Sequence, residues 1–422
     1  MSGFSYISGS LHAEQVSLTA IAEAVGTPTY VYSGDTIRAT YRDFAEAFSD
    51  RDALICYAVK ANSNLAVLGL LAREGAGADA VSIGEVKRAV AAGVSPQKIV
   101  FAGVAKSAAE IEEALTIGIL QFNVESLPEL ERISAIAAAR GLVADVAIRI
   151  NPDVDAGTHA KITTGKKGNK FGIDLDQAKA VYAHAATLPG IRAAAVAMHI
   201  GSQITTVAPF EAALIRLVAL AQELIAAGHP ITRIDCGGGV GIPYHGEAPI
   251  DIGAYAEMVK RVTAGFTGTL MFEPGRYLVG NAGVLLSRIE YVKQGSDRRF
   301  YILDAGMNDL IRPAMYEAWH EIISVRETAE TLAAVDIVGP ICESSCIFAK
   351  DRPMPPLVDG DLLAILSAGA YSAAMASSYN TRALPAEVLV EGDQFAVIKP
   401  RRSLDDLFAD ESPTPAFVST GS

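Results

Sequence analysis

Charged and polar side chains follow several apolar runs of this chain, and their types suit covalent and acid–base chemistry. Lys60 lies in the segment AVKAN, Asp79 in ADAVS, His199 in HIGSQ and Glu273 in FEPGR. A lysine amine can act as a nucleophile, and carboxylates and imidazoles can hold or transfer protons. A single lysine after a strand is usually a solvated charge. Four such groups after successive runs indicate an active site instead.

A run of glycines follows another apolar run, in the segment CGGGVG. Gly237, Gly238 and Gly239 lack Cβ atoms, so several of their backbone N–H groups could converge on a phosphate or another anion. The alternative is a tight turn. The run differs from a dinucleotide-binding fingerprint, because no helix is expected to begin directly after it.

Two other glycine-containing segments are assigned no ligand. GAGADA at 75–80 precedes an expected strand, so we interpret it as the end of a helix. TGKKGNKFG at 164–172 lacks the spacing of a phosphate-binding loop, and we expect a flexible basic loop there.

The four cysteines predict neither a disulfide framework nor a metal site. Cys56, Cys236, Cys342 and Cys346 are few and scattered, whereas disulfide-stabilised domains are short and rich in cysteine. Cys342 and Cys346 have no flanking histidine that would complete a zinc site, so no metal is expected. By spacing alone, Cys342 is more readily interpreted as a small buried side chain than as a catalytic group.

The composition argues against several classes of partner. The 422 residues carry 35 Lys+Arg against 48 Asp+Glu, a formal net charge of −13, which does not suit nucleic acid or an anionic membrane. Hydrophobic residues make up 50% of the chain and charged residues 20%, which is enough apolar material for a large core. The expected partner is a small molecule or another protein chain.

The sequence also bears on location. The N-terminal segment MSGFSYISGS lacks the basic and apolar regions of an export signal, so we expect a cytoplasmic protein. Residues 362–381 are uncharged and long enough to cross a bilayer, but Ser, Gly, Tyr and Asn interrupt the stretch. No membrane span is expected.

The elements that must position these side chains alternate regularly between about residues 54 and 275. Short apolar runs, each followed by a helical segment, are typical of an α/β fold, the (β/α)8 TIM-type barrel, whose active site lies at the C-terminal ends of the strands. A doubly wound open sheet is the alternative. The expected strands are 54–59, 78–82, 98–103, 120–124, 144–150, 194–200, 232–237 and 270–275, and the expected helices are 85–92, 108–117, 127–140, 175–187, 209–227 and 255–263.

After residue 280 the pattern changes to strands without long helices, which predicts a second, mostly β C-terminal domain. Strands are expected at 284–293, 298–306, 336–339 and 362–366, with a hairpin over 388–399 that turns at Gly392 and Asp393. The strand-like TYVYSG at 29–34 is expected to pair with this domain. We therefore expect an N-terminal segment at 1–34, a barrel at 35–280, a β domain at 281–410 and a mobile tail at 411–422.

Six motifs make the chain similar to the fold-type III, pyridoxal-phosphate-dependent amino-acid decarboxylases, which share an alanine racemase-like fold. They are YAVKAN (57–62), HIGSQ (199–203), GGGVGIPY (237–244), EPGR (273–276), GPICES (339–344) and AGAYSAAMASSYN (368–380). The segments at 151–173 and 348–352 resemble more narrowly the branch that acts on diaminopimelate. The resemblance implies decarboxylation of meso-2,6-diaminopimelate to L-lysine, the last step of lysine biosynthesis.

Two alternatives remain open. One is the same chemistry on another amino acid or on carboxynorspermidine. The other is a non-catalytic relative that binds the cofactor or a partner without turnover. The presence of both Lys60 and Cys342 argues against the second alternative, since a regulator needs neither.

The resemblance implies that the cofactor, pyridoxal 5'-phosphate, is bound by strand-end residues. Lys60 would form the imine through an amine of lowered pKa, Glu273 would keep the ring nitrogen protonated, and His199 would lie against the ring. Asp79 is expected near Lys60, with a helix cap as its alternative role. The expected cofactor-binding residues are Lys60, Asp79, His199, Ser202, Gly237, Gly238, Gly239, Glu273, Pro274, Gly275, Arg276 and Tyr371.

The resemblance also implies a homodimer with shared active sites. Cys342 of the partner subunit would protonate the carbanion left by decarboxylation, and Lys60, Cys342 and His199 form the expected catalytic set. An arginine fork suits the distal carboxylate of the substrate. The expected substrate-binding residues are Arg276, Arg312, Tyr316, Glu343 and Tyr371, with Glu343 on the distal ammonium. Cys346 departs from the acidic or small residue usual in the family, and its spacing from Cys342 would allow a disulfide.

Overall fold

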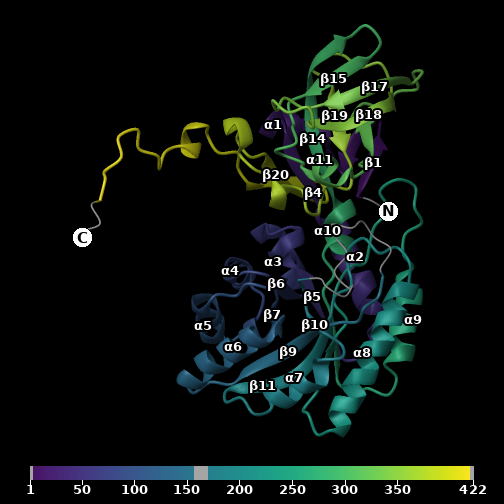
Figure 1. Ribbon diagram of the computed structural model, residues 1–422. Helices are drawn as coiled ribbons and strands as arrows, with labels where there is room; N and C mark the ends of the chain where they lie inside the picture. The colour runs from purple at the N-terminus through teal and green to yellow at the C-terminus, as the bar shows by residue number, and fades with distance from the viewer. Residues whose placement is uncertain (1–2, 156–169, 419–422) are drawn as a thin grey trace.

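The computed structural model describes residues 3–155 and 170–418, and two structural regions share this chain (Figure 1). A barrel of parallel strands with helices around it occupies the lower part of the view, and a mostly β region lies above it. Most of the family-like segment at 151–173, and most of the predicted basic loop at 164–172, lies outside the described residues.

The barrel is a closed ring of eight parallel strands. β5 pairs with β6 on one side and β13 on the other, and β9 pairs with both β8 and β11, which closes the ring. The strands are β5 (Ala53–Ala58), β6 (Gly77–Ala80), β7 (Ile99–Phe101), β8 (Gln121–Val124), β9 (Ala144–Asn151), β11 (Ile191–Met198), β12 (Arg233–Asp235) and β13 (Thr269–Phe272), and the short β10 (Ile173–Asp174) adds to β9. The predicted barrel is confirmed, and the open doubly wound sheet is excluded because its edge strands would not pair.

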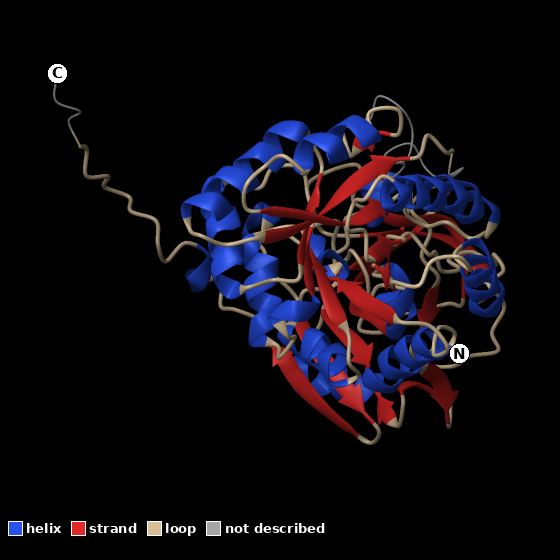
Figure 2. Ribbon diagram, turned by 90° about the horizontal axis from the view of Figure 1, so that it is seen from below, coloured by secondary structure: helices blue, strands red, loops and turns tan. Residues whose placement is uncertain are grey.

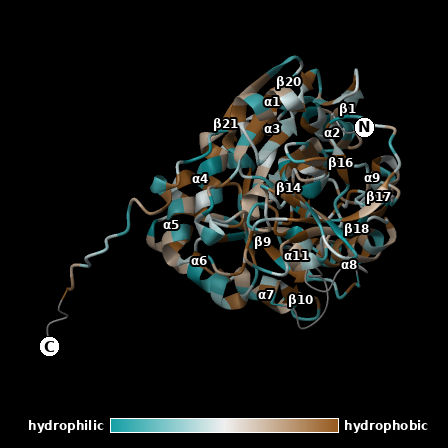
Figure 3. Ribbon diagram, turned by 90° about the horizontal axis from the view of Figure 1, so that it is seen from above, coloured by the Kyte–Doolittle hydropathy of each residue, from teal (hydrophilic) through white to brown (hydrophobic). Residues whose placement is uncertain are grey.

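Helices cover the outside of the strands (Figure 2). They are α3 (Leu65–Arg73), α4 (Ile83–Ala91), α5 (Ala108–Ile117), α6 (Leu127–Ala139), α7 (Ala178–Ala185), α8 (Ala208–Ala226) and α9 (Ile252–Val262). Helices such as α4 and α5 carry both hydrophilic and hydrophobic segments (Figure 3), as expected where one face packs on the strands.

The prediction that every barrel strand is followed by a helix is wrong at the last strand. β13 leads only to the four-residue α10 (Arg276–Val279), from which the chain continues into the β region. The vacant position is covered by α2 (Gly34–Glu46), which precedes the barrel. The ring of Phe44 in α2 lies 5.6 Å from that of Phe272 in β13 and 6.3 Å from that of Tyr255 in α9. A helix from the other end of the barrel sequence therefore buries the apolar face of β13.

Side-chain and glycine caps define the helix ends. Ser107 and Glu110 form a capping box at the start of α5. At the end of α3, Gly75 has a φ of +100°, and its N–H donates to the carbonyl of Ala72 while that of Ala76 donates to Leu71. This pair of hydrogen bonds is a Schellman motif, which confirms that GAGADA ends a helix.

The β region is organised around the long strand β14 (Gly283–Gln294). It pairs antiparallel with β4 (Thr29–Ser33), β15 (Arg299–Leu303) and β19 (Leu362–Ile365). β4 also pairs with β20 (Ala386–Glu391), which forms the predicted hairpin with β21 (Gln394–Lys399). The remaining elements are β1 (Phe4–Ile7), β2 (Ser10–Ala13), β3 (Val16–Ser17), α1 (Leu18–Val25), α11 (Arg312–Tyr316), β16 (Ile322–Ser324), β17 (Ala333–Val338) and β18 (Ile347–Met354).

Alternation along β4 connects two apolar cores. Tyr30 and Tyr32 face the large core that continues from the barrel, whereas Val31 faces a smaller core with Leu18 and Ile21 of α1. The barrel and the β region are therefore joined by continuous apolar packing. In the part of the chain that the structure describes, no helix is both long and apolar enough to cross a membrane.

Candidate active site

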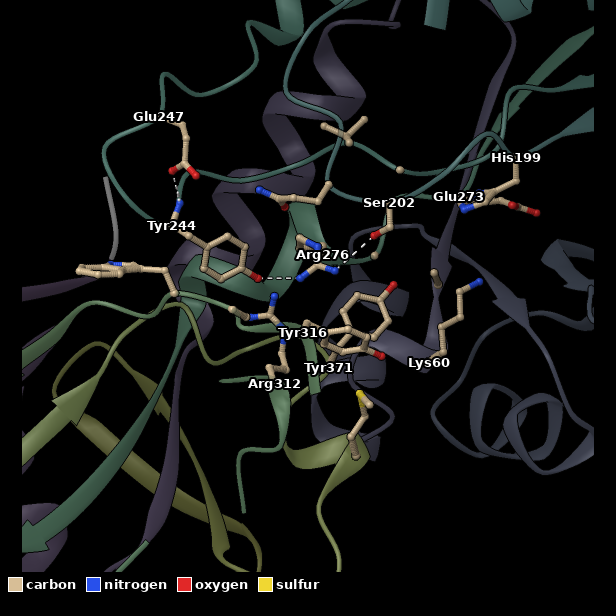
Figure 4. A pocket seen from close by; sticks show the side chains of 18 residues that line it. Lys60, His199, Ser202, Tyr244, Glu247, Glu273, Arg276, Arg312, Tyr316 and Tyr371 are labelled. Atoms are coloured by element: carbon tan, nitrogen blue, oxygen red, sulfur yellow. Dashed lines mark hydrogen bonds between the residues drawn. The ribbon is translucent and has the colours of Figure 1, made fainter. Parts of the chain in front are cut away.

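A cavity of about 390 Å³ lies where the C-terminal ends of the barrel strands face the β region (Figure 4). The lining residues are Ala58, Lys60, His199, Ser202, Gln203, Gly239, Val240, Tyr244, Glu247, Glu273, Gly275, Arg276, Arg312, Tyr316, Ala318, Trp319, Tyr371 and Met375. Lys60 and Glu273 lie toward one end, and Tyr244 and Arg312 toward the other. Many of the side chains singled out from the sequence thus share one cavity.

Lys60 and Asp79 form an ion pair at the barrel end of the cavity. Lys60 follows β5 in a short 3-10 turn, and its Nζ donates to Oδ2 of Asp79 at 2.7 Å. Parallel pairing sets Asp79 of β6 opposite Ala58, two residues before Lys60. The alternative that Asp79 caps a helix is wrong, because Ser82 caps α4. The second carboxylate oxygen, Oδ1, is buried without a hydrogen-bond partner.

The expectation of a lowered pKa for Lys60 concerns the amine beside the bound cofactor. Among the protein groups alone, burial lowers the pKa of this amine, but the carboxylates of Asp79 and Glu273, together with Tyr371, outweigh burial and raise it above its ordinary value. Lys60 is therefore a charged ammonium in this setting, and loss of its proton must precede attack on a carbonyl carbon.

Glu273 and Asp235 form a pair of buried carboxyl groups beneath Lys60. The amide Nδ2 of Asn123 donates to both, at 3.0 Å to Glu273 and 3.1 Å to Asp235. Burial raises the pKa of Glu273 well above its ordinary value, and the nearby Asp235 and Asp79 raise it further. Burial also raises the pKa of Asp235. Glu273 is thus a carboxyl group at the cavity wall that a cationic ligand atom would stabilise in its ionised form.

The glycine run is needed for close packing, and most of its N–H groups are not free to bind an anion. A Cβ on Gly237 would lie 2.1 Å from the carbonyl oxygen of Met198, and one on Gly238 would lie 2.1 Å from that of Glu273. The N–H of Gly237 donates to Oδ1 of Asp235, and that of Gly238 donates to Nδ1 of His199. Of the N–H groups expected to converge on an anion, those of Gly237 and Gly238 therefore have protein acceptors. Gly239 is the member of the run that lines the cavity.

His199 is held as a neutral ring on the cavity wall. Its Nδ1 accepts the N–H of Gly238 at 3.3 Å. Burial lowers the pKa of His199 well below its ordinary value, and the positive charges of Arg149 and Lys60 lower it further. A flat, uncharged ring at this position can pack against a planar ligand.

Two buried arginines form the opposite end of the cavity. Arg276 is 7% and Arg312 is 6% exposed. Arg276 donates to Oη of Tyr244 at 2.6 Å and to Oγ of Ser202 at 3.2 Å, while its Nε is buried without a partner. Among the described residues, no carboxylate forms an ion pair with either arginine. A buried guanidinium without a counter-ion is costly, so the pair is suited to an anionic ligand.

The other predicted residues near the cofactor end lie in or next to the cavity. Tyr371 has a φ of +55°, its N–H donates to the carbonyl of Ala61, and its ring lies 4.7 Å from the guanidinium carbon of Arg276. Gly275 and Tyr316 line the cavity. Pro274 instead supports β5, because its carbonyl accepts the N–H of Ala58 at 3.1 Å.

Cys342 and Glu343 do not line the cavity of their own chain in the described structure. Cys342 is exposed, with its N–H bound to Oδ1 of Asn380, and Glu343 accepts the hydroxyl of Tyr379 at 2.7 Å. Cys346 is buried and accepts the N–H of Met307. All four cysteines are free thiols, so Cys342 and Cys346 form no disulfide.

Several cavity residues were not singled out from the sequence. Tyr244 ends the motif GGGVGIPY, and Trp319 follows the predicted Tyr316 by three residues, but spacing gives no sign of their contacts. Asn123 and Asp235 lie inside predicted strands and resemble ordinary core-edge polar residues. Their roles depend on contacts across the barrel, which only the fold provides.

The groups gathered here suit a ligand with an aldehyde and a basic ring nitrogen at one end of the cavity and a carboxylate at the other. Lys60 offers the amine for a carbonyl carbon. Glu273 offers a carboxyl group for a ring nitrogen, and His199 a flat surface. Arg276 and Arg312 offer guanidiniums that form no ion pair with a carboxylate of the described residues. In the described residues, no cluster of His, Cys, Asp and Glu could hold a metal ion.

Known proteins with the same organisation match nearly the whole chain. The pyridoxal binding domain of pyridoxal-dependent decarboxylases matches residues 34–280. Diaminopimelate decarboxylase of Pseudomonas fluorescens is 51% identical over 416 residues, which is 98% of this chain and 100% of the relative. The crystal structure of diaminopimelate decarboxylase from Helicobacter pylori complexed with L-lysine has a TM-score of 0.90 at 43% identity, covering 93% of this chain and 98% of that chain. The enzyme from M. jannaschii in co-complex with L-lysine has a TM-score of 0.94 at 37% identity, covering 98% and 99%.

Proposed function

This chain belongs to the diaminopimelate decarboxylases within the pyridoxal-dependent decarboxylase family, and from that premise we propose which residues perform each part of the reaction. It is a carboxy-lyase that uses pyridoxal 5'-phosphate to convert meso-2,6-diaminopimelate to L-lysine and CO₂. The bound cofactor supplies an electron-withdrawing ring that accepts the electron pair left by CO₂.

Lys60 would hold the cofactor covalently through its amine, and Asp79 would orient that amine through the 2.7 Å hydrogen bond. Glu273 would either carry a proton or pair with a protonated ring nitrogen. Burial raises the pKa of Glu273 and so disfavours an ionised carboxylate that has no cationic partner. His199 would pack against the ring as a neutral imidazole. Ser202, Gly239 and Arg276 would bind the phosphate, with Tyr371 beside it.

Arg312, Arg276 and Tyr316 would bind the distal carboxylate of the substrate. The observation that carries this assignment is that neither buried arginine has a carboxylate partner among residues 3–155 and 170–418. Two guanidinium forks meet one carboxylate with charge-assisted hydrogen bonds. A substrate without that carboxylate would leave the two charges buried and uncompensated, at a cost of a few kcal/mol.

A homodimer would complete the site. Cys342 of the partner subunit would deliver a proton to the carbon that has lost CO₂, and Glu343 of the partner subunit would bind the distal ammonium. Their exposure outside the cavity of their own chain supports a role across an interface.

The function is tested by measuring CO₂ and L-lysine released from meso-diaminopimelate by the purified holoenzyme. We expect stoichiometric release, and little turnover of ornithine or carboxynorspermidine in the same assay. Turnover of ornithine without turnover of meso-diaminopimelate would contradict the assigned substrate.

Shared sites are tested with mixed dimers of Lys60→Ala and Cys342→Ala subunits. Each homodimer should lack activity, because each site lacks one of the two groups. A mixed dimer contains one site with both groups intact, so partial activity should return on mixing. No return of activity in verified mixed dimers would show that each site draws both residues from one chain.

The four unpaired thiols also support a cytoplasmic location, because reducing compartments keep cysteines in this state. Cell fractionation with an antibody against the chain tests this. Recovery in an extracytoplasmic fraction would contradict it.

A further inference from the structure

The two arginines of the cavity repel each other, so other side chains must hold them in place. The charge of Arg276 lowers the pKa of Arg312, in addition to the larger effect of burial. Both guanidiniums are almost completely buried. Before a ligand arrives, two like charges of this kind stay together only if neighbouring groups fix their positions.

Tyr244 lies between the two arginines. The guanidinium carbon of Arg312 is 4.6 Å from the centre of the Tyr244 ring, and that of Arg276 is 5.8 Å from the same centre. The hydroxyl oxygen of Tyr244 accepts a hydrogen bond from Nη1 of Arg276 at 2.6 Å (Figure 4). The Tyr244 ring therefore stabilises both guanidiniums through cation–π contacts, and its hydroxyl also binds Arg276.

His320 fixes Arg312 through a hydrogen bond. Its Nε2 lies 2.8 Å from Nη1 of Arg312, and its Nδ1 lies 2.8 Å from the carbonyl oxygen of Leu366. A carbonyl can only accept, so Nδ1 donates and Nε2 is the lone-pair nitrogen that accepts from Arg312. The His320 and Tyr244 rings meet edge to face at 5.4 Å.

The segment that carries Tyr244 is itself held at two points. The amide of Gln203 donates to the carbonyl of Ile242 and accepts its N–H. The carboxylate of Glu247 accepts the N–H groups of Tyr244 and His245 at 2.7 and 2.6 Å. Tyr244 is thus a fixed support and not a loose loop side chain.

We propose that Tyr244 and His320 are positioning residues that hold Arg276 and Arg312 as a preformed receptor for the carboxylate of the amino-acid centre that does not react. Neither residue need touch the reacting atoms. The proposal rests on the proposed function, because that function supplies the carboxylate. Beyond that function, the proposal states that selectivity for a second carboxylate depends on two side chains that orient the arginines.

Two small molecules separate this role from a general effect on the site. L-Lysine keeps the carboxylate of the centre that does not react, whereas 1,5-diaminopentane has both amines and no carboxylate. Inhibition constants for both are measured on the holoenzyme, together with kcat and KM for meso-diaminopimelate. Trp319 lines the cavity and is the single tryptophan of the chain, so its fluorescence gives L-lysine binding independently of turnover.

Tyr244→Phe removes the hydroxyl and keeps the ring, and His320→Leu removes the acceptor for Arg312. Each should weaken L-lysine binding and raise KM by about 10-fold, the effect of one hydrogen bond to a charged group. The inhibition constant of 1,5-diaminopentane and kcat should stay within about two-fold, since the reacting end is untouched. His320→Gln restores an acceptor and should recover most of the affinity for L-lysine.

His184→Leu is the matched control, because His184 lies on α7 and is bonded to Glu131 outside the cavity. It should change none of these constants. The positioning role is wrong if the wild type turns over meso-diaminopimelate and both Tyr244→Phe and His320→Leu bind L-lysine with the affinity of the wild type. An equal loss of affinity for both inhibitors would also overturn it. If His320→Leu does not fold, Tyr244→Phe alone decides by the same two comparisons. A wild type without turnover of meso-diaminopimelate contradicts the proposed function instead.

Discussion

The two ends of the cavity carry opposite kinds of charged group. At the barrel end, the ammonium of Lys60 lies near the carboxyl groups of Asp79 and Glu273. At the other end, Arg276 and Arg312 lie on Tyr244 without a carboxylate partner in the described residues. The first end is ready for a cationic ring nitrogen and the second for a carboxylate. The net charge of −13 describes neither end.

The two ends also differ in how they are built. The acidic end comes from strands of one closed barrel, whose register sets Asp79 opposite Ala58. The cationic end joins Arg276, which follows β13, to Arg312 and His320 of the β region. The acidic end therefore depends on strand pairing, and the cationic end on the docking of two regions against each other. Changes at each end should differ in kind as well as in size.

Glu273→Gln should have the largest effect and should act in opposite directions on activity and stability. We expect activity to fall by about 10²-fold, because the ring nitrogen loses its ionised partner. The cofactor-free variant should gain about 1 kcal/mol or more in free energy of unfolding at neutral pH, because a buried carboxylate is removed. Turnover and thermal unfolding of both proteins measure this.

The direction of the pKa shift of Glu273 determines how stability should change with pH. The pKa of Glu273 is raised in the folded state, so the stability it contributes is present below its unfolded pKa and is lost as pH rises through the folded pKa. The cofactor-free wild type should therefore lose stability with rising pH more than Glu273→Gln does. Equal pH profiles would contradict the account of the acidic end.

Arg312→Leu should act mainly on substrate binding. We expect KM for meso-diaminopimelate to rise by about 10- to 100-fold, the loss of a forked, charge-assisted contact. Arg312→Lys keeps the charge without the fork and should recover only part of this loss. Steady-state kinetics of the three proteins provide the measurement. A fall in kcat at unchanged KM would place Arg312 at the reacting end instead.

His320→Gln should have the smallest effect on activity, and its effect on stability should appear only in acid. Burial and the charge of Arg312 lower the pKa of His320 to about 3. The stability that the neutral ring contributes is present above its unfolded pKa of about 6.5 and is lost as pH falls toward the folded pKa. Between pH 7 and pH 5 the wild type should lose about 2 kcal/mol through this group.

The glutamine variant does not titrate in this range and should lack that loss. Denaturation midpoints of both proteins at pH 7 and pH 5 provide the measurement. Arg276 and Arg352 also face His320 and remain charged throughout, so they do not produce the difference. An equal loss of stability between pH 7 and pH 5 in His320→Gln would contradict the assignment of His320 as a neutral support of Arg312.

Sequence patterns were most reliable where structure is local. The eight barrel strands and the hairpin at Gly392 follow from apolar periodicity and turn residues, which depend on neighbours in the chain. The regular alternation of strand and helix fails after β13, because α2, from before the barrel, covers that strand. The expected convergence of several glycine N–H groups on an anion is limited because Asp235 and His199 accept the N–H groups of Gly237 and Gly238. Both errors come from contacts between distant segments.

The amino-acid sequence by itself favoured the barrel and, through motifs shared with a known family, indicated the cofactor and singled out Lys60, Glu273, Arg276 and Arg312, because strand periodicity and motif residues are local features of the chain. Only the tertiary structure decided their charge states and their supports. Lys60 is an ammonium because β6 sets Asp79 beside it, and the arginines stay together because Tyr244 and His320 approach from separate segments. Distances between such segments fix both the electrostatics and the hydrogen bonds, and no local pattern encodes them.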